Sequence, residues 1–356
     1  MLSQEMAPMD AQVVTALIAA SVSLILAGYN TWNGRNQDKR VALLEERRAE
    51  LENLAAAERA RLDYEYDARR GIYERCGPAM FQIVELSEDA LGCITALTDP
   101  ETWLELAKGE VNPPGTLRAT LPRERYEVLA TIYGLYAPMV VVRQLSRKLS
   151  LTDLSLEPKI ELQYHLASSI YRSFRDDQRL AAIDPTIAYS PFASEWRSRR
   201  ETEPSQFWWQ GLTLGRLEGM LDLMTVKPEG GDERVTSFGE FERFYQEIFL
   251  DQDEIRRKVV AAAANAIYCF RPKDRPVFWR MLIAQARLYQ ALARSRRNAL
   301  TIPDSESAWL EYLRLEDQQE FSWRGSESGA PLAETLAVTD EYLRATVVAP
   351  WLSRKV

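Results

Sequence analysis

Hydrophobic and polar positions divide this chain into one long apolar segment near its N-terminus and a charged, helix-patterned remainder. Residues 11–34 carry no charged side chain, whereas charges recur through the rest of the chain. A helix needs roughly 20 apolar residues to cross a bilayer. A cleaved signal peptide would need basic residues before its apolar part, and residues 1–10 contain no Lys or Arg. We therefore expect a transmembrane helix at 11–34, preceded by a short extracytoplasmic segment at 1–10.

The end of the apolar segment predicts its orientation. Tyr29 and Trp32 stand where aromatic side chains meet lipid headgroups, and Arg35, Lys39 and Arg40 follow at once. Positive charges favour the cytoplasmic side of a span. We therefore expect a single-pass protein of the cytoplasmic membrane, with its N-terminus outside and its C-terminal domain in the cytoplasm.

Small residues recur every four positions within the predicted span, at Thr15, Ala19, Ser23 and Ala27. Such a stripe lets two helices approach closely in lipid, so it favours a homo-oligomer. A pore is a further possibility, although no ionisable residue in the span marks an ion path. The alternative is chance, because Ala and Ser are common in membrane spans.

The helical period continues past the span into a highly charged segment at 35–77, in which acids and bases alternate at helical spacing. Leu44, Leu51 and Leu54 follow a heptad, which Glu58 interrupts. The pattern predicts a long helix that either forms a short coiled coil with other copies or folds back as a hairpin. Gly77–Pro78 is expected to kink or end it.

The remainder, residues 78–356, predicts one cytosolic all-α domain, because its apolar period is helical almost everywhere. The apolar run 259–270 is expected to be the central buried helix, since it is too short to span a bilayer. An S-x-x-E capping box at Ser237 and Glu240 predicts a helix start. Other long helices are expected at 123–149, 157–183 and 277–297.

A glycine repeat follows two tryptophans in this domain. Gly211, Gly215 and Gly219 are spaced by four, and each would cost about 1 kcal/mol in a helix relative to Ala. Such a cost indicates a backbone pressed closely against another helix. Trp208 and Trp209, just before the repeat, are large enough to anchor a core or an interface. The segment therefore predicts either core packing or a groove for a ligand or partner.

The titratable residues single out few candidates for chemistry. His165, the one histidine, falls off the apolar stripe of its helix and is expected to face solvent or a groove. Asp176 and Asp177 stand between Arg175 and Arg179, which predicts local ion pairs.

Composition narrows the function classes. The net charge of −8 argues against nucleic acid as a partner. One histidine and three cysteines without close spacing leave no zinc motif, and the chain has no Gly-rich phosphate loop and no nucleophile-elbow string. We therefore assign no catalytic, cofactor or metal site. Carboxylate chemistry stays open, with Asp176, Asp177 or Glu218 as contributors.

Three strings carry a resemblance to known proteins: DYEYDARRGIYERCGPAMFQ from Asp63, LEPKIELQYHLASSIYRSFRDDQRLA from Leu156 and PKDRPVFWRMLIAQARLYQAL from Pro272. They resemble a group of uncharacterised actinobacterial membrane-anchored helical proteins. The resemblance implies one span, a charged helix and a helical body over most of the chain. It implies no activity, ligand or site residue.

Three functions are compatible with these patterns. The first is a non-enzymatic, membrane-anchored interaction or scaffold protein whose helical domain binds a cytosolic protein or a small ligand. The second is an oligomeric, channel-like effector that perturbs the membrane, by analogy with anchored helical proteins of bacterial defence. The third is a carboxylate-based enzyme. The anchor, the small-residue stripe, the long loop at 184–205 and the lack of catalytic strings favour the first.

Overall fold

The computed structural model describes residues 11–99, 122–149, 153–194, 196–199, 209–250, 254–267, 270–297, 302–324 and 332–354. It is 79% helix and 1% strand, which confirms the predicted all-α class. The chain divides into two compact units, Met1–Ala68 and Arg69–Val356.

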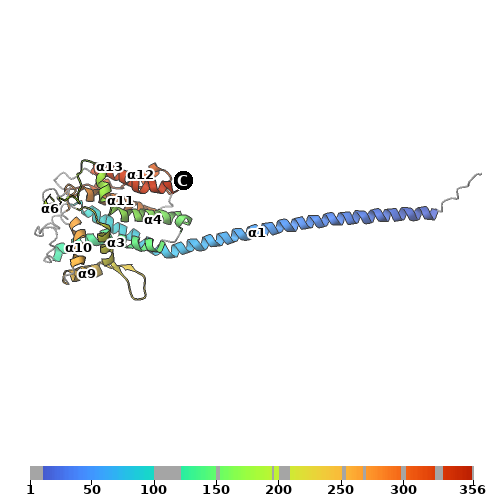
Figure 1. Cartoon of the computed structure of the whole chain (residues 1–356), viewed down its shortest axis with the longest axis horizontal. Helices are drawn as coiled ribbons and strands as arrows, with labels where there is room; N and C mark the ends of the chain where they lie inside the picture. Colours follow the sequence, from blue (N-terminus) through green and yellow to red (C-terminus); the bar gives the residue numbers. More distant parts are fainter. Residues whose placement is uncertain are drawn as a thin grey trace, which may run out of the picture. The chain divides into compact units, whose positions relative to one another are not determined.

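The first unit consists of the N-terminal part of helix α1, Ala11–Ala96 (Figure 1). Its large apolar side chains are exposed, with Leu24 at 74% and Ile25 at 71%. In the charged segment Arg48 pairs with Glu52 at 2.9 Å, one turn later on the same helix. Both side chains are largely exposed, so such a pair adds little to stability.

Two of the described helices are long and apolar enough to cross a membrane. One is α1, where none of the apolar window is buried; the other is α3, Pro122–Leu149, where 83% is buried. The hydropathy of α3 is thus that of a core helix. The apolar window of α1 has no such cover from the residues that the structure describes.

The second unit is a bundle of helices with one small hairpin (Figure 1). Its longer helices after α3 are α4 Pro158–Ser173, α8 Leu214–Leu223, α9 Phe238–Leu250, α10 Glu254–Ile267, α11 Pro276–Arg297 and α13 Leu332–Leu343. Its shorter helical segments are η1 Leu154–Leu156, α5 Asp177–Ala182, α6 Trp196–Arg199, α12 Glu306–Tyr312, η2 Gln318–Phe321, the π-helical η3 Arg344–Val348 and α14 Ala349–Ser353. Strands β1 Thr225–Val226 and β2 Arg234–Val235 pair antiparallel.

The second unit begins upstream of the predicted boundary at residue 78, because Ile72 and Cys76 of α1 are already buried in its core. Of the two outcomes expected at Gly77–Pro78, a kink or an end of the helix, the end is wrong, since α1 runs on to Ala96. Pro78 is exposed within this continuous helix.

Helix α11, rather than the predicted 259–270 run, is the centre of the bundle. It packs against α4, α13 and α5, and is buried along nearly its whole length. Large side chains on several of its faces, such as Trp279, Met281 and Leu282, lie in the core. The predicted helix at 277–297 is therefore present but buried on more sides than its amphipathic pattern indicates.

Three arginines spaced by seven along α11 tie this helix to its neighbours. Arg280 pairs with Asp184, which follows α5, and Arg287 pairs with Asp340 of α13. Arg287 also donates to the carbonyl of Leu313 at 2.8 Å. Arg294 pairs with Glu316 at 2.8 Å. Because a heptad brings residues to one face, one stripe of α11 holds three other segments in place.

The capping box at the start of α9 has the predicted geometry. The Ser237 amide donates to Glu240 Oε2 at 2.7 Å, and the Glu240 amide donates to Ser237 Oγ at 3.3 Å. Arg234 of β2 adds a two-pronged contact to the same carboxylate, at 2.7 and 2.8 Å. These hydrogen bonds hold the pKa of Glu240 well below its usual range, with the Arg234 contact as the largest cause.

We predict that Arg287→Ala lowers the free energy of unfolding by about 3 kcal/mol, because it leaves two buried acceptors, the Leu313 carbonyl and Thr339 Oγ1, without their donor. Urea denaturation followed by circular dichroism measures this. Arg314→Ala is the matched control, since Arg314 is exposed and its contact with Glu311 spans 3.8 Å. Equal losses in both variants would contradict a special role for Arg287.

We also predict opposite effects of Ala at two helical glycines. A Cβ on Gly134 would lie 2.5 Å from Cys93 Sγ, whereas one on Gly92 meets no atom within 4 Å. Gly134→Ala should therefore destabilise by about 1–3 kcal/mol through overpacking. Gly92→Ala should stabilise by about 0.5–1 kcal/mol through its helix propensity. Thermal unfolding of both variants tests the pair; a stabilised Gly134→Ala would refute the close contact.

Candidate functional site

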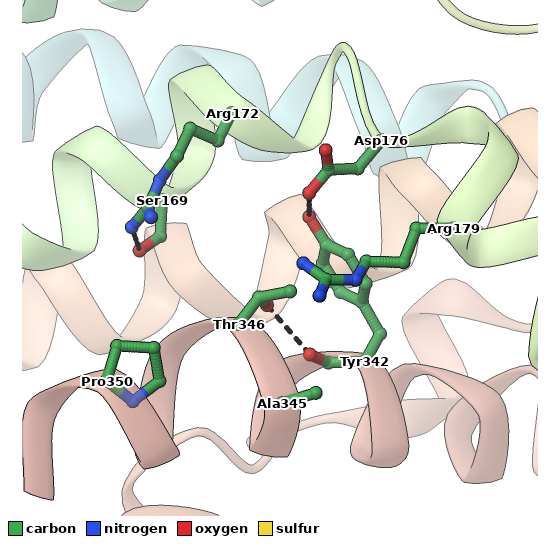
Figure 2. A pocket seen from close by; sticks show the side chains of 8 residues that line it. All are labelled: Ser169, Arg172, Asp176, Arg179, Tyr342, Ala345, Thr346 and Pro350. Atoms are coloured by element: carbon green, nitrogen blue, oxygen red, sulfur yellow. Dashed lines mark hydrogen bonds between the residues drawn. The ribbon is translucent and has the colours of Figure 1, made fainter. Parts of the chain in front are cut away.

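A pocket of about 270 Å³ lies between two walls of the second unit (Figure 2). One wall comes from α4, the corner after it and α5; the other comes from α13, the π-helical segment η3 and α14. The lining residues are Ser169, Arg172, Asp176, Arg179, Tyr342, Ala345, Thr346 and Pro350.

The first wall exists because the predicted helix 157–183 is interrupted. The carbonyl of Phe174 accepts a hydrogen bond from the Leu212 amide at 3.0 Å, so it is engaged outside the helical ladder. The Phe174 ring is buried 4.9 Å from that of Tyr136. The helix therefore ends at Ser173 and restarts at Asp177, which places Asp176 in the corner, facing the second wall.

The second wall changes its helical register beside Pro350. Proline has no amide hydrogen, and its ring crowds the carbonyl four residues earlier. In η3 the amide of Ala349 instead reaches back five residues, to the carbonyl of Arg344. A π-helical turn in this position widens the helix next to Ala345, whose side chain is small. Such turns are often found at functional sites.

Polar groups from the two walls meet across the pocket. The Tyr342 hydroxyl donates to Asp176 Oδ2 at 2.8 Å (Figure 2). Burial and the nearby Asp176 carboxylate raise the pKa of Tyr342 well above its usual range, so the phenol keeps its proton. Arg172 Nη2 donates to Ser169 Oγ at 3.0 Å. Arg179 makes no hydrogen bond or ion pair with another described residue, and its guanidinium points into the pocket.

His165 lies behind this pocket and is buried at 3% exposure, so its expected polar-faced placement is wrong. Its Nε2 lies 2.9 Å from the Val347 carbonyl of η3, and its ring packs on those of Trp309 and Trp351. Because a carbonyl only accepts, Nε2 carries the proton. Burial lowers the pKa of His165 to about 4, which keeps the ring neutral near pH 7.

The adjacent acids do not form the predicted local ion pairs within the described residues. Asp176 is held by Tyr342, and Asp177 accepts from the Tyr189 hydroxyl at 2.6 Å. Burial raises the pKa of Asp177. Glu218 contacts Arg143 at 3.1 Å instead of facing the pocket. The three carboxylates are thus engaged by separate partners.

The segment that begins at Trp209 packs on Phe192 and contacts the first turn of α11. Trp208 lies outside the described residues. Trp209 packs edge to face on Phe192, with ring centroids 4.3 Å apart. The fully buried Gln210 accepts, at its Oε1, the amides of Val277 and Phe278 at 2.9 and 3.1 Å. This caps the first turn of α11 from a distant part of the sequence.

The three glycines of the repeat differ in their surroundings. A Cβ on Gly211 would lie 2.7 Å from the Cβ of Asp177, and one on Gly219 would lie 3.1 Å from Val259 of α10. Gly215 has no atom within 4 Å of that position. Gly211 precedes α8, so it is not helical. Close packing therefore holds at two of the three positions.

The residues expected in and around the membrane all lie in the first unit. Thr15, Ala19, Ser23 and Ala27 are exposed in α1, as are Tyr29, Trp32, Lys39 and Arg40. Arg35 belongs to the same helix. The pocket, by contrast, was missed by sequence reasoning; the cue was Pro350 within an otherwise helical pattern.

The comparisons with known proteins supply no identity for the site. No protein-family model, curated protein or solved structure matches the chain. Among the described residues, no three His, Cys, Asp or Glu side chains form a group that could hold a metal ion.

We predict that stability falls as the pH drops through the titration of His165. Its pKa is about 4 when folded and near 6.5 when unfolded, so only the unfolded chain gains a proton between these values. The loss begins near pH 6.5, reaches about 3 kcal/mol by pH 4 and then levels off. Because His165 is the sole histidine, one imidazole NMR signal reports its pKa in protein without a histidine tag. A midpoint near 6.5 would contradict the buried, neutral ring.

Proposed function

We propose that this protein is a membrane-anchored interaction protein. The segment 11–34 of α1 crosses the bilayer once, with the N-terminus outside, and the helical second unit binds a small ligand or partner in the cytoplasm. The observation that carries the proposal is the charge-free stretch of α1, whose large apolar side chains are exposed and covered by none of the described residues. Apolar surface of that extent calls for lipid or another protein.

The same helix supports self-association. Thr15, Ala19 and Ser23 lie within one stripe, and a stripe of small side chains permits close helix packing in lipid. Beyond the span, Leu44 and Leu51 are 69% and 65% exposed at heptad spacing. A second copy in parallel would cover both features at once, because they continue along one helix.

The second unit supports a binding role more than a catalytic one. Its histidine is buried and engaged by a backbone carbonyl, and its acids Asp177 and Glu218 have structural partners. The pocket beside η3 instead offers a hollow with a guanidinium that has no partner among the described residues. A hollow with a few directed polar groups is typical of a ligand site.

We predict that the full-length protein is a dimer or larger oligomer in detergent and that Ala19→Leu shifts it to monomer, because Leu separates the helix backbones. Light scattering with size-exclusion chromatography measures the mass. Ser21→Leu is the matched control, since it enlarges a small residue on the opposite face of the same helix. A wild-type protein that is monomeric in both detergent and lipid nanodiscs would overturn self-association.

A further inference from the structure

We propose that the pocket beside the π-helical segment η3 binds a small phosphorylated polyol, such as a sugar phosphate. The guanidinium groups of Arg172 and Arg179 take the phosphate, and acceptors on the walls take the hydroxyl groups. This inference rests on the binding role proposed above and names the ligand class.

The charge of the pocket favours an anion. Two arginines and one aspartate line it, in a chain whose net charge is −8. The lining of the pocket therefore carries more positive than negative charge, although the chain as a whole is negative. Arg344, which lies on the same π-helical segment, is already paired with Glu306 at 2.6 Å and does not contribute a further free charge.

The arginines differ in how they are held. Arg172 donates from Nη2 to Ser169 Oγ and from Nε to the Ser168 carbonyl at 3.3 Å, which positions its guanidinium along α4. Its Nη1 keeps its hydrogens for a ligand. Arg179 has all five N–H groups available to the pocket, since no described residue accepts from it. Arginine pairs with phosphate in a two-pronged geometry, so these two groups suit a phosphate monoester.

A phosphate monoester suits the site better than a carboxylate. Asp176 repels any anion that enters, and a monoester carries a charge of about −1.5 to −2 at pH 7 against −1 for a carboxylate. The larger charge gains more from the two guanidinium groups. The doubly charged group therefore binds more tightly despite the acidic corner.

The remaining polar groups call for hydroxyl donors on the ligand. The Tyr342 hydroxyl already donates its hydrogen to Asp176, and the Thr346 hydroxyl donates its hydrogen to the Tyr342 carbonyl at 2.7 Å. Ser169 Oγ donates to the His165 carbonyl, also at 2.7 Å. What these oxygens still offer is lone pairs. A ligand that combines a phosphate with hydroxyl groups satisfies both halves of the pocket.

The volume limits the size of the ligand. About 270 Å³ falls below the range of roughly 300–1,000 Å³ typical of pockets for drug-sized molecules. A group of about the size of a sugar phosphate fills this volume, and a phosphorylated lipid headgroup shares the same chemistry. The two sources, a free sugar phosphate and a headgroup, are separable by experiment.

The test is isothermal titration calorimetry of the full-length protein in detergent with ribose 5-phosphate, and with ribose as the unphosphorylated control. We expect saturable one-to-one binding of ribose 5-phosphate and none of ribose. Arg179→Ala should weaken binding about 10- to 100-fold, because a hydrogen bond to a charged group is lost. Arg175→Ala is the matched control, since this exposed arginine flanks Asp176 without lining the pocket.

A second variant keeps both guanidinium groups. Ala345→Leu fills the hollow from η3, so it should abolish binding while the unfolding midpoint stays unchanged. Equal binding of ribose, equal losses in Arg179→Ala and Arg175→Ala, or failure of ribose 5-phosphate together with absence of the lipid effect described next would each overturn the proposal.

The lipid arm uses nanodiscs of phosphatidylcholine with or without phosphatidylinositol 4-phosphate. Thermal stabilisation by this lipid that disappears in Arg179→Ala supports the phosphate site and assigns its source to the headgroup; stabilisation that persists in that variant counts against the pocket. Oligomer mass, measured on the same samples, tests the anchor separately, so failure of the pocket and failure of the anchor are distinguishable.

Discussion

The second unit depends on the burial of α11 together with its arginines. A helix surrounded by other helices must place charged side chains in a medium where an unpaired charge is costly. Arg280 and Arg287 meet this demand by pairing with Asp184 and Asp340, which belong to segments far apart in the sequence. Hydrogen-bonded ion pairs depend on direction, whereas hydrophobic contacts do not, so these pairs favour one position of each neighbouring segment along α11. The neighbouring segments therefore have one register against α11, and the corner and wall that form the pocket follow from it.

The helical content of this chain can be predicted from its sequence because a helix buries the residues along one face, and these apolar residues then recur in the sequence about every 3.6 positions. The helices near 123–149 and 277–297 and the capping box at Ser237 depend on such local patterns, and the structure has them. Local patterns do not reveal which helix is central. The run at 259–270 is more uniformly apolar than α11, yet α11 is buried along nearly its whole length, and its arginines find partners across the fold.

The predictions for His165 and for the helix at 157–183 fail for the same reason. His165 lies off the apolar stripe of α4, but a second layer formed by η3 and Trp351 covers that face. The break after Ser173 depends on the Leu212 amide, which arrives from a loop that no periodicity describes. Both are decided by tertiary contacts that satisfy buried polar groups, and such contacts have no signature within a window of sequence.

The π-helical segment connects these observations to function. Pro350 has no amide hydrogen to donate to the helical hydrogen-bond pattern. The helix widens into a π-helical turn there instead of ending, and the buried Val347 and Val348 hold this turn in place. The widened turn faces α4 across a hollow that close packing would otherwise fill. Beside the hollow, His165 of α4 engages the Val347 carbonyl, so a contact between the two walls fixes the register of η3. A wall whose register is fixed in this way presents a preorganised surface, so a ligand that binds there loses little free energy in ordering it.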